Sequence, residues 1–402
     1  MSISLQAEGL VFPEKESFFP NTLSEFVYKR TYSRWLDNEK RRETWPETVQ
    51  RYMDFISIKC SGKVPASVLQ SIQKSILSMD VLPSMRALWS AGFPAARDNT
   101  CLYNCSFLPV DCIPAFSEAL YILMQGTGVG FSVESIFTER LPVVAPLSGK
   151  TIEHTIPDCT EGWADALKFG ITEFYKGNDV RFDFSEIRLK GAILKTKGGR
   201  ASGPEPLQNL LNYARETIHG AAGRKLTSLE CHDMMCFIAD IVVVGGVRRA
   251  AMISFSDVDD LEMRHAKDWT RGQFPKIRYM SNNSSYFNER PSEEVFRAEW
   301  AALKASGSGE RGFSSGNWHQ RADRPKGFTR SNPCHEIGLR FTLAEDPWTG
   351  AGGSGQFCNL SAAVLRSWDT AETMAEKIKL ATWLGCIQAS YTHFPYLRDG
   401  WR

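Results

Sequence analysis

Three reactive side chains alternate with other residues in one short stretch, Ser331-Asn332-Pro333-Cys334-His335-Glu336-Ile337. On an extended backbone, residues two apart project to the same side, so an amide, a thiol and a carboxyl would enter one space. A helix would spread these groups around its axis, and Pro333 disfavours a helix interior. We therefore predict a strand end or a tight extended loop here. The alternative is a buried cysteine between solvent-facing polar residues, since a free cysteine is often just a small hydrophobe.

The chain around this stretch has 402 residues, enough for two domains or one large α/β unit. Its formal net charge of +1 gives no support for a nucleic-acid-binding surface. No apolar run approaches the roughly 20 residues that a membrane span needs, and the first residues lack the basic and apolar regions of a signal peptide. These features predict a cytoplasmic protein with no membrane or nucleic-acid partner, in which the ten cysteines stay reduced.

Helical spacing of apolar residues predicts a helical N-terminal region over residues 1–95, clearest from residue 22 to about 80. Beyond it, strand-like and helical segments alternate. Strands are expected within 99–109, 128–133, 182–187 and 354–360, and helices within 114–124, 160–176, 206–220, 229–241, 292–304 and 371–389. This alternation predicts an α/β barrel or open sheet over residues 96–402 rather than an α+β fold.

Two glycine-rich segments suggest close backbone approaches. The run 126–130 has the form G-x-G-x-G and enters a strand instead of opening a helix, so a dinucleotide-binding fingerprint is a poor interpretation. Close backbone packing or approach to a ligand explains it better. The segment 245–251 places Arg248 and Arg249 beside free backbone amides, which suits phosphate contacts. The alternative for this segment is a solvated turn with surface arginines.

The cysteine pattern argues against zinc and against a cysteine hydrolase. Cys101/Cys105 and Cys231/Cys236 lack the spacing and matched partners of zinc ligands, so we expect no metal site. A cysteine hydrolase needs a histidine partner that makes the thiolate. Glu336, two residues from Cys334, would instead raise the pKa of that thiol. A neutral thiol is badly placed for ionic attack and suits hydrogen-atom transfer, which points to radical chemistry.

Several ordered motifs of the sequence resemble those of a known family. Residues 332–337 are similar to the finger-loop motif Asn-x-Cys-x-Glu of the catalytic (alpha) subunit of ribonucleotide reductases. Residues 103–107 and 357–360 resemble that family's two redox-cysteine strands. Further segments match in the family's order, at 126–132, 198–204, 246–251 and 281–284. Residues 28–35 and 83–86 are most like the monomeric, adenosylcobalamin-dependent (class II) branch.

The resemblance implies a ten-stranded α/β barrel, with a finger loop around 331–340, that reduces ribonucleotides to 2′-deoxyribonucleotides for DNA synthesis. Cys334 would form a thiyl radical and remove the ribose 3′ hydrogen. Glu336 would act as general base on the 3′-hydroxyl, and Asn332 would hydrogen-bond the sugar hydroxyls. Cys105 and Cys358 would supply two electrons and close to a disulfide, with Cys101 as the rival for the first redox position.

The same resemblance implies ligands and partners. Substrate contacts are expected from Ser84, Ser106, Gly128 and Asn332, and contacts to an allosteric nucleoside triphosphate from Gly199, Arg200, Gly246, Arg248 and Arg249. Adenosylcobalamin is the expected radical source. The alternative is a chain without a bound cofactor that receives the radical from a separate ferritin-like metal subunit. An external dithiol protein such as thioredoxin would reduce the disulfide.

The sequence also departs from the family pattern. The family's N-terminal nucleotide-binding cone has no counterpart, and the chain stops at Arg402, before the later barrel strands and the tail with its cysteine pair. We therefore expect a fragment, or a split-gene product whose barrel a second polypeptide completes, and little turnover by this chain alone. The competing classes are a glycyl-radical barrel enzyme, although no glycine-radical segment is visible, and a non-catalytic nucleotide-binding fragment.

Overall fold

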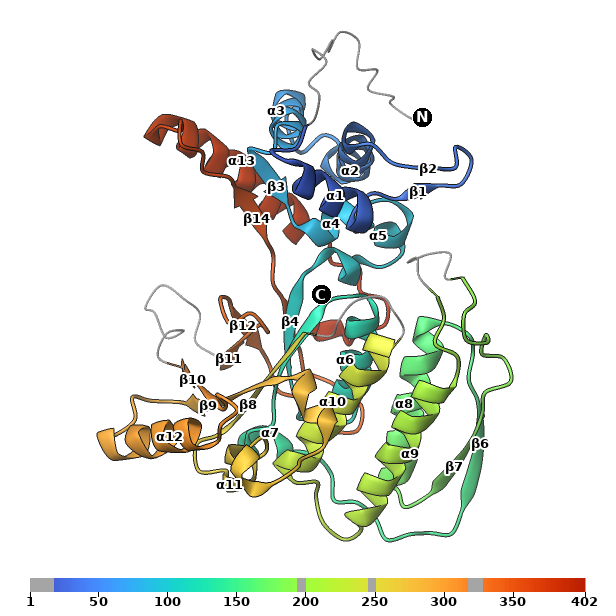
Figure 1. The fold of residues 1–402 in the computed structure, drawn as a ribbon. Helices are drawn as coiled ribbons and strands as arrows, with labels where there is room; N and C mark the ends of the chain where they lie inside the picture. The colour runs from blue at the N-terminus through green and yellow to red at the C-terminus, as the bar shows by residue number, and fades with distance from the viewer. Residues whose placement is uncertain (1–17, 194–199, 245–250, 317–327, 402) are drawn as a thin grey trace. The chain divides into compact units, whose positions relative to one another are not determined.

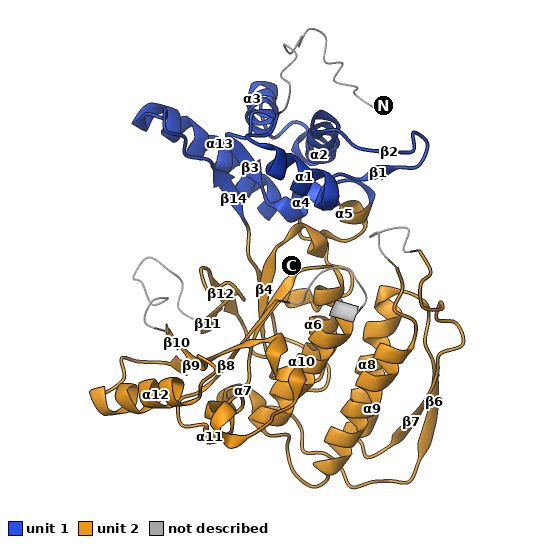
Figure 2. Ribbon diagram, in the orientation of Figure 1, with its two compact units in different colours: residues 1–93, 360–390 blue, residues 94–359, 391–402 orange. Residues whose placement is uncertain are grey.

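The computed structural model describes residues 18–193, 200–244, 251–316 and 328–401. The chain divides into two compact units (Figure 2). Unit 1 comprises residues 1–93 and 360–390, and unit 2 comprises residues 94–359 and 391–402. Unit 1 thus includes a late segment, 360–390, that the sequence division had assigned to the barrel region.

Unit 1 is mainly helical, as the apolar spacing predicted. Its helices are α1 (Thr22–Thr31), α2 (Trp45–Cys60), α3 (Ala66–Leu77), α4 (Met85–Ser90) and α13 (Ala371–Ala389). Its short strands pair antiparallel, β1 (Trp35–Leu36) with β2 (Arg41–Arg42), and β3 (Val81–Pro83) with β14 (Ser361–Ala363). Helix α2 begins where a capping box between Thr44 and Glu47 satisfies the first backbone amides, and it buries one apolar face.

A six-stranded sheet forms the centre of unit 2 (Figure 1). The order is β10-β9-β8-β5-β4-β13. Five strands run parallel, β4 (Cys105–Pro109), β5 (Gly128–Ser132), β8 (Met252–Asp257), β9 (Asn282–Phe287) and β10 (Gly312–Ser315), and β13 (Gln356–Phe357) is antiparallel to β4. The predicted α/β alternation is confirmed, and the ten-stranded barrel stays a prediction.

Helices cover this sheet. Helix α6 (Pro114–Met124) connects β4 to β5 and is buried along nearly its whole length. It packs against α8 (Thr160–Tyr175) and α10 (Ser228–Val244), and both of these contact α9 (Glu205–Gly220). Strands β6 (Thr151–Thr155) and β7 (Asp179–Asp183) form a separate parallel pair beside α8 (Figure 1). The other α-helices described in unit 2 are α7 (Ser135–Thr138), α11 (Leu261–Arg264) and α12 (Glu293–Ala305), and the sequence boundary between the units falls within α5 (Phe93–Arg97).

One strand prediction was too broad, and another was wrong in position. The strand expected within 99–109 begins only at Cys105, because residues 99–102 form a 3₁₀ turn in which Asp98 accepts a hydrogen bond from the Thr100 N–H. The strand expected within 182–187 lies at 179–183 and ends where Asp183 accepts a hydrogen bond from the Ser185 backbone. Among the described residues, no helix is long and apolar enough to cross a membrane.

Candidate active site

The stretch 331–337 forms the turn of a β-hairpin. Strands β11 (Phe328–Ser331) and β12 (Gly338–Phe341) pair antiparallel, with Ser331 opposite Gly338. His335 has a φ of +68°, in the left-handed region, and its N–H donates to the Asn332 carbonyl at 2.9 Å. The predicted extended alternation is therefore wrong. Asn332 is fully buried, whereas Cys334 and Glu336 are exposed.

Three thiols nevertheless meet at this hairpin. Cys105 opens β4 and Cys358 follows β13, and their backbones are joined by a hydrogen bond from Cys358 N–H to the Cys105 carbonyl, 2.8 Å. The Cys105 N–H also donates to Sγ of Cys358 at 3.0 Å. The Sγ atoms of Cys105 and Cys334 are 4.0 Å apart. Cys101 lies in the preceding 3₁₀ turn, where its thiol donates to the Asp98 carbonyl at 3.2 Å.

The environment keeps the Cys105 thiol protonated. Its hydrogen bond with Cys358 and its burial both raise its pKa well above the usual value near 9, and the side chains of Asn332 and Cys334 only partly oppose this. A group held as S–H is a poor ionic nucleophile and a competent donor of hydrogen atoms or of electrons with protons. Burial and a neighbouring thiol thus keep Cys105 protonated, whereas the neutral thiol that the sequence predicted at Cys334 stays a prediction.

Asn332 presents a donor to this site. Its Oδ1 accepts a hydrogen bond from the Ile337 N–H at 3.0 Å, which closes the turn. Its Nδ2 is buried and makes no hydrogen bond of good geometry within the described part of the chain, although the Asn332 side chain interacts with the Cys105 thiol and lowers the pKa of that thiol. A buried amide donor in this position would gain a full hydrogen bond from a ligand that supplies an oxygen acceptor. Glu336 is exposed, and its carboxylate makes no hydrogen bond or ion pair with any described residue.

Glycines in β5 make room for the hairpin. A Cβ added at Gly130 would lie 2.5 Å from the Ser331 carbonyl oxygen, and one at Gly128 would lie 3.2 Å from Cγ of Pro333. The hairpin therefore lies directly on the backbone of β5, which no larger residue would permit. The expectation of close backbone packing is confirmed. Ser106 lies next to this contact, where its buried Oγ donates to the Gly128 carbonyl at 3.0 Å.

A buried ion pair at the base of the hairpin escaped sequence analysis. Arg330 makes two bonds to Glu134, Nε to Oε2 and Nη2 to Oε1, both 2.7 Å. Both side chains are almost fully buried, and the guanidinium stacks 3.4 Å from the ring centroid of Tyr286. No local pattern indicates this pair, because its members are 196 positions apart.

The remaining candidate residues lie elsewhere or outside the described residues. Ser84 belongs to unit 1, where its hydroxyl caps α4 by accepting from the Ala87 N–H. Arg200 is exposed and donates to the Gly191 carbonyl at 2.9 Å. Gly199, Gly246, Arg248 and Arg249 fall outside the described residues. Within the described ranges, no cluster of three or more His, Cys, Asp or Glu side chains could hold a metal ion.

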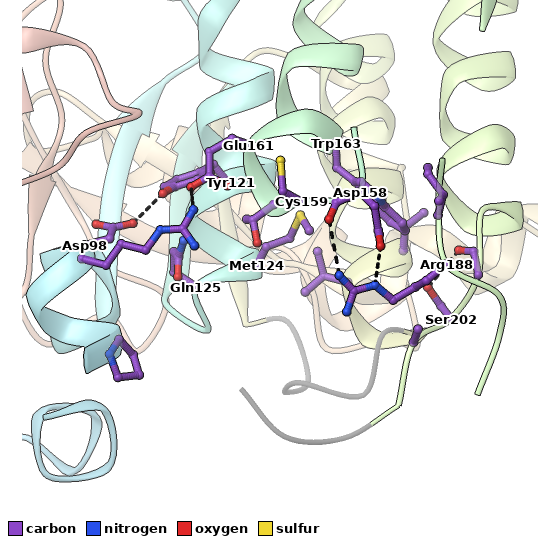
Figure 3. Close-up of a pocket in the computed structure, with 18 of the residues that line it drawn as sticks. Asp98, Tyr121, Met124, Gln125, Asp158, Cys159, Glu161, Trp163, Arg188 and Ser202 are labelled. Atoms are coloured by element: carbon purple, nitrogen blue, oxygen red, sulfur yellow. Dashed lines mark hydrogen bonds and ion pairs between the residues drawn. The ribbon is translucent and has the colours of Figure 1, made fainter. Parts of the chain in front are cut away.

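Unit 2 also contains a cavity of about 570 Å³ beside α6 and α8 (Figure 3). Two ion pairs lie along its wall, Arg188 with Asp158 and Arg97 with Glu161, each at 2.7 Å. Tyr121 donates to Asp98 at 2.6 Å, and burial raises its pKa, so the phenol remains a donor. Further lining residues come from the neighbourhood of the glycine-rich segment 198–204 and from the end of α10, namely Ile193, Ala201, Ser202, Gly203, Ile241 and Val242.

Comparison with known proteins places the chain among relatives of ribonucleotide reductases. Residues 11–93 match the ribonucleotide reductase alpha domain. Residues 145–218 match the insertion domain of B12-dependent ribonucleotide reductase, which covers β6, α8, β7 and most of α9. The resemblance drawn from the sequence motifs is confirmed, including its adenosylcobalamin-dependent branch.

Individual relatives agree with this. The chain is 30% identical over 360 residues to the adenosylcobalamin-dependent ribonucleoside-triphosphate reductase of Levilactobacillus brevis, covering 70% of this chain and 47% of the relative. It is 32% identical over 295 residues to the enzyme of that name from Euglena gracilis, covering 68% and 40%. The chain thus spans about half the length of these relatives. A crystal structure of a B12-dependent (class II) ribonucleotide reductase has the same fold, with a TM-score of 0.72 and 23% identity, over 92% of this chain and 59% of that one.

Proposed function

We propose that this chain carries the thiyl-radical site of an adenosylcobalamin-dependent ribonucleotide reductase. The observation that carries the proposal is the convergence of three thiols at one buried amide. Cys105, Cys334 and Cys358 meet although 253 positions separate the first from the last, and the buried Asn332 side chain interacts with the Cys105 thiol. One radical thiol, two reducing thiols and an amide donor are the groups that this reaction requires.

Each of these side chains then takes part in one step of the reduction. The Cys334 thiyl takes the 3′ hydrogen atom of the ribose, and Glu336 accepts the 3′-hydroxyl proton. The 2′-hydroxyl leaves as water. Cys105 and Cys358 supply two electrons and two protons, one hydrogen for the 2′ carbon and one proton for the leaving group, and become a disulfide. Cys334 finally returns its hydrogen to the 3′ carbon, and Glu336 returns its proton to the 3′ oxygen. The raised pKa of Cys105 supports this role, because it delivers a proton together with an electron.

Adenosylcobalamin, when bound, would supply the organic radical that generates the thiyl. The residues at the hairpin fit this requirement, because the Cys334 thiol is exposed and can be reached from outside the site. Exposed residues 334–336 of the hairpin would face the cofactor. A reductant with two thiols, of the thioredoxin kind, would reopen the Cys105–Cys358 disulfide after each turnover.

The cavity beside α6 and α8 is our candidate for the allosteric nucleotide. Its mixed apolar and charged walls suit a base and a phosphate chain, and it adjoins the segment in which Arg200 was expected to contact the effector. Triphosphates are the proposed substrate class, since the relatives are named ribonucleoside-triphosphate reductases. We also propose that the six-stranded sheet is part of a ten-stranded barrel whose other strands correspond to the half of the relatives not matched here.

The experiment tests the thiyl cysteine in a completed enzyme. The chain is joined to the part of the Levilactobacillus brevis relative that it does not match and is assayed for deoxyribonucleotide formation with adenosylcobalamin and dithiothreitol. Cys334→Ala should abolish reduction and leave nucleotide binding intact. Cys386→Ala, at another exposed cysteine, is the control and should retain activity. Reduction that survives Cys334→Ala would refute the assignment. Binding without reduction by the unsubstituted chimera would favour a nucleotide-binding protein.

A further inference from the structure

We infer that the buried pair of Glu134 and Arg330, stacked on Tyr286, positions the Cys334 thiol against Cys105. These are positioning residues and not catalytic ones, since they act through the backbone of the hairpin. The inference deepens the proposed function and rests on it only for what the positioned thiol does. The geometry itself is tested below on thiols alone.

The pair joins the hairpin to the central sheet at a fixed point. Glu134 lies two residues beyond the end of β5, and Arg330 lies in β11, four residues before Cys334. Ser132, the last residue of β5, donates to Glu134 Oε2 at 2.7 Å and so fixes the carboxylate. A bidentate Arg–carboxylate pair is directional as well as strong, which sets the orientation of β11 relative to β5.

Tyr286 adds a second attachment, from β9. Its ring lies under the guanidinium, with 3.4 Å between Cζ of Arg330 and the ring centroid. Its hydroxyl donates to the Thr329 carbonyl at 3.0 Å. Two sheet strands therefore hold two successive residues of β11. The close contact of the Ser331 carbonyl with Gly130 follows immediately, so an error in the placement of Arg330 would pass directly into the turn.

Stability alone is a weak reason for such a pair. Removing two charges from water is costly, and replacing a buried ion pair by apolar residues is often neutral or stabilising. The pair has 4% and 0% of its side-chain surface exposed, so this cost applies in full. What apolar residues cannot supply is a single orientation. A loop that must hold one sulfur 4.0 Å from another needs that orientation more than it needs stability.

We measure this positioning as the effective concentration of the Cys334 thiol at the Cys105 thiol, obtained from a thiol–disulfide exchange equilibrium with glutathione. The full chain carries Cys358→Ser, so that Cys334 is the neighbouring thiol of Cys105, and is equilibrated with reduced and oxidised glutathione. Two protein thiols are oxidised to the Cys105–Cys334 disulfide while one oxidised glutathione is reduced to two thiols. Peptide mass mapping gives the fraction formed. Arg330→Met should lower the effective concentration at least tenfold. Arg340→Met, on the exposed side of the same hairpin, is the control and should change it less than twofold.

A double variant separates positioning from stability. Arg330→Met leaves Glu134 buried without its partner, so it also destabilises the fold. Glu134→Gln combined with Arg330→Met leaves no buried charge and should recover most of the stability in urea denaturation, while the effective concentration stays at least tenfold low. Tyr286→Phe keeps the ring but loses the hydroxyl, with its bond to the Thr329 carbonyl and its interaction with Arg330, and should lower the effective concentration about two- to fivefold.

Two results would overturn the inference. One is a double variant with the parent's effective concentration. The other is an Arg340→Met control that loses as much as Arg330→Met. If the Arg330→Met single variant fails to fold, the double variant and Tyr286→Phe still decide the matter. Absence of reductase activity in the chimera would leave these thiol measurements unchanged, so the two proposals fail separately.

Discussion

Two regions of unit 2 use the same pair of chemical groups in opposite ways. At the base of the hairpin, the Arg330–Glu134 pair exposes 4% and 0% of its side-chain surfaces. Along the cavity wall, the Arg188–Asp158 pair exposes 40% and 31%, and the Arg97–Glu161 pair 58% and 30%. The distances are equal, 2.7 Å in each case. The distance between the charged atoms therefore does not distinguish a positioning pair from a surface pair.

The two kinds of ion pair differ in whether water or a ligand can replace one of the partners. Water can replace either partner at the cavity wall, so these charges are available to a charged ligand. The buried Arg330 guanidinium has no access to water that could take the place of Glu134, so that pair has one arrangement. The comparison suggests a division of labour within one unit. The proposed radical site is built on buried, directional contacts, and the proposed nucleotide site on contacts that a ligand can take over.

The sharpest test of this contrast removes the arginine from the buried pair. Arg330→Met should lower the free energy of unfolding by about 3–5 kcal/mol, because it leaves a buried carboxylate without its counter-charge. Urea denaturation followed by far-UV circular dichroism measures the loss. A loss below about 1 kcal/mol would mean that water reaches Glu134, and the proposed division between the two regions would then fail.

A second test places an extra atom between the hairpin and the sheet. Gly130→Ala brings a Cβ to 2.5 Å from the Ser331 carbonyl oxygen, so one backbone must move, at a cost of about 1–3 kcal/mol. Gly220→Ala is the matched control at the end of α9, where an added Cβ meets nothing within 4 Å. The control should be neutral or stabilising by up to about 1 kcal/mol. Equal effects of the two substitutions in urea denaturation would contradict the packing described here.

Local sequence patterns predicted those parts of the fold that local forces determine. The helix expected within 114–124 matches α6, and the one within 206–220 matches α9 to within one residue. The glycines of β5 were correctly taken as a close backbone approach, because few other roles demand glycine inside a strand. The thiols Cys105 and Cys358 came from motif resemblance, since nothing in their spacing indicates that two distant strands will be neighbours.

The rest of the site depends on contacts that a linear pattern does not contain. The turn at 332–337 takes its shape from the pairing of β11 with β12 and from a left-handed His335, so the alternation of Asn332, Cys334 and Glu336 did not place them on one side. The Glu134–Arg330 pair joins elements that become neighbours only in the folded sheet. The cavity combines residues from α6, the start of α8 and the segments 187–193 and 201–203, which no single motif unites.

The thiols of the buried site should respond to pH differently from exposed ones. The Cys105 pKa is raised by Cys358 and by burial, so the folded state keeps this proton at pH values where the unfolded chain loses it. Iodoacetamide should therefore alkylate Cys105 at least about tenfold more slowly than exposed Cys386 between pH 8 and 9.5, by peptide mass mapping. Because the folded state binds the extra proton, Cys105 should stabilise the fold fully below pH 9 and lose this contribution above it. Equal alkylation rates would show that the site is open and that the thiol is unperturbed.

The exposed ion pair of Arg188 and Asp158 at the cavity wall should give the smallest effect on stability. Arg188→Met removes the partner of Asp158 at the cavity wall, and the free energy of unfolding should fall by less than about 1 kcal/mol, because both groups are accessible to water. The exposed pair of Arg181 and Glu153 on β7 and β6 supplies the control, Arg181→Met, with an equally small effect on stability.

The Arg188→Met and Arg181→Met variants should differ in nucleotide binding. Arg188→Met should weaken the binding of a deoxynucleoside triphosphate, measured by isothermal titration calorimetry, at least about fivefold, because it removes a cation from the cavity, and Arg181→Met should leave it unchanged. Equal affinities in both variants would remove the cavity from consideration as the nucleotide site while leaving the thiol site untouched.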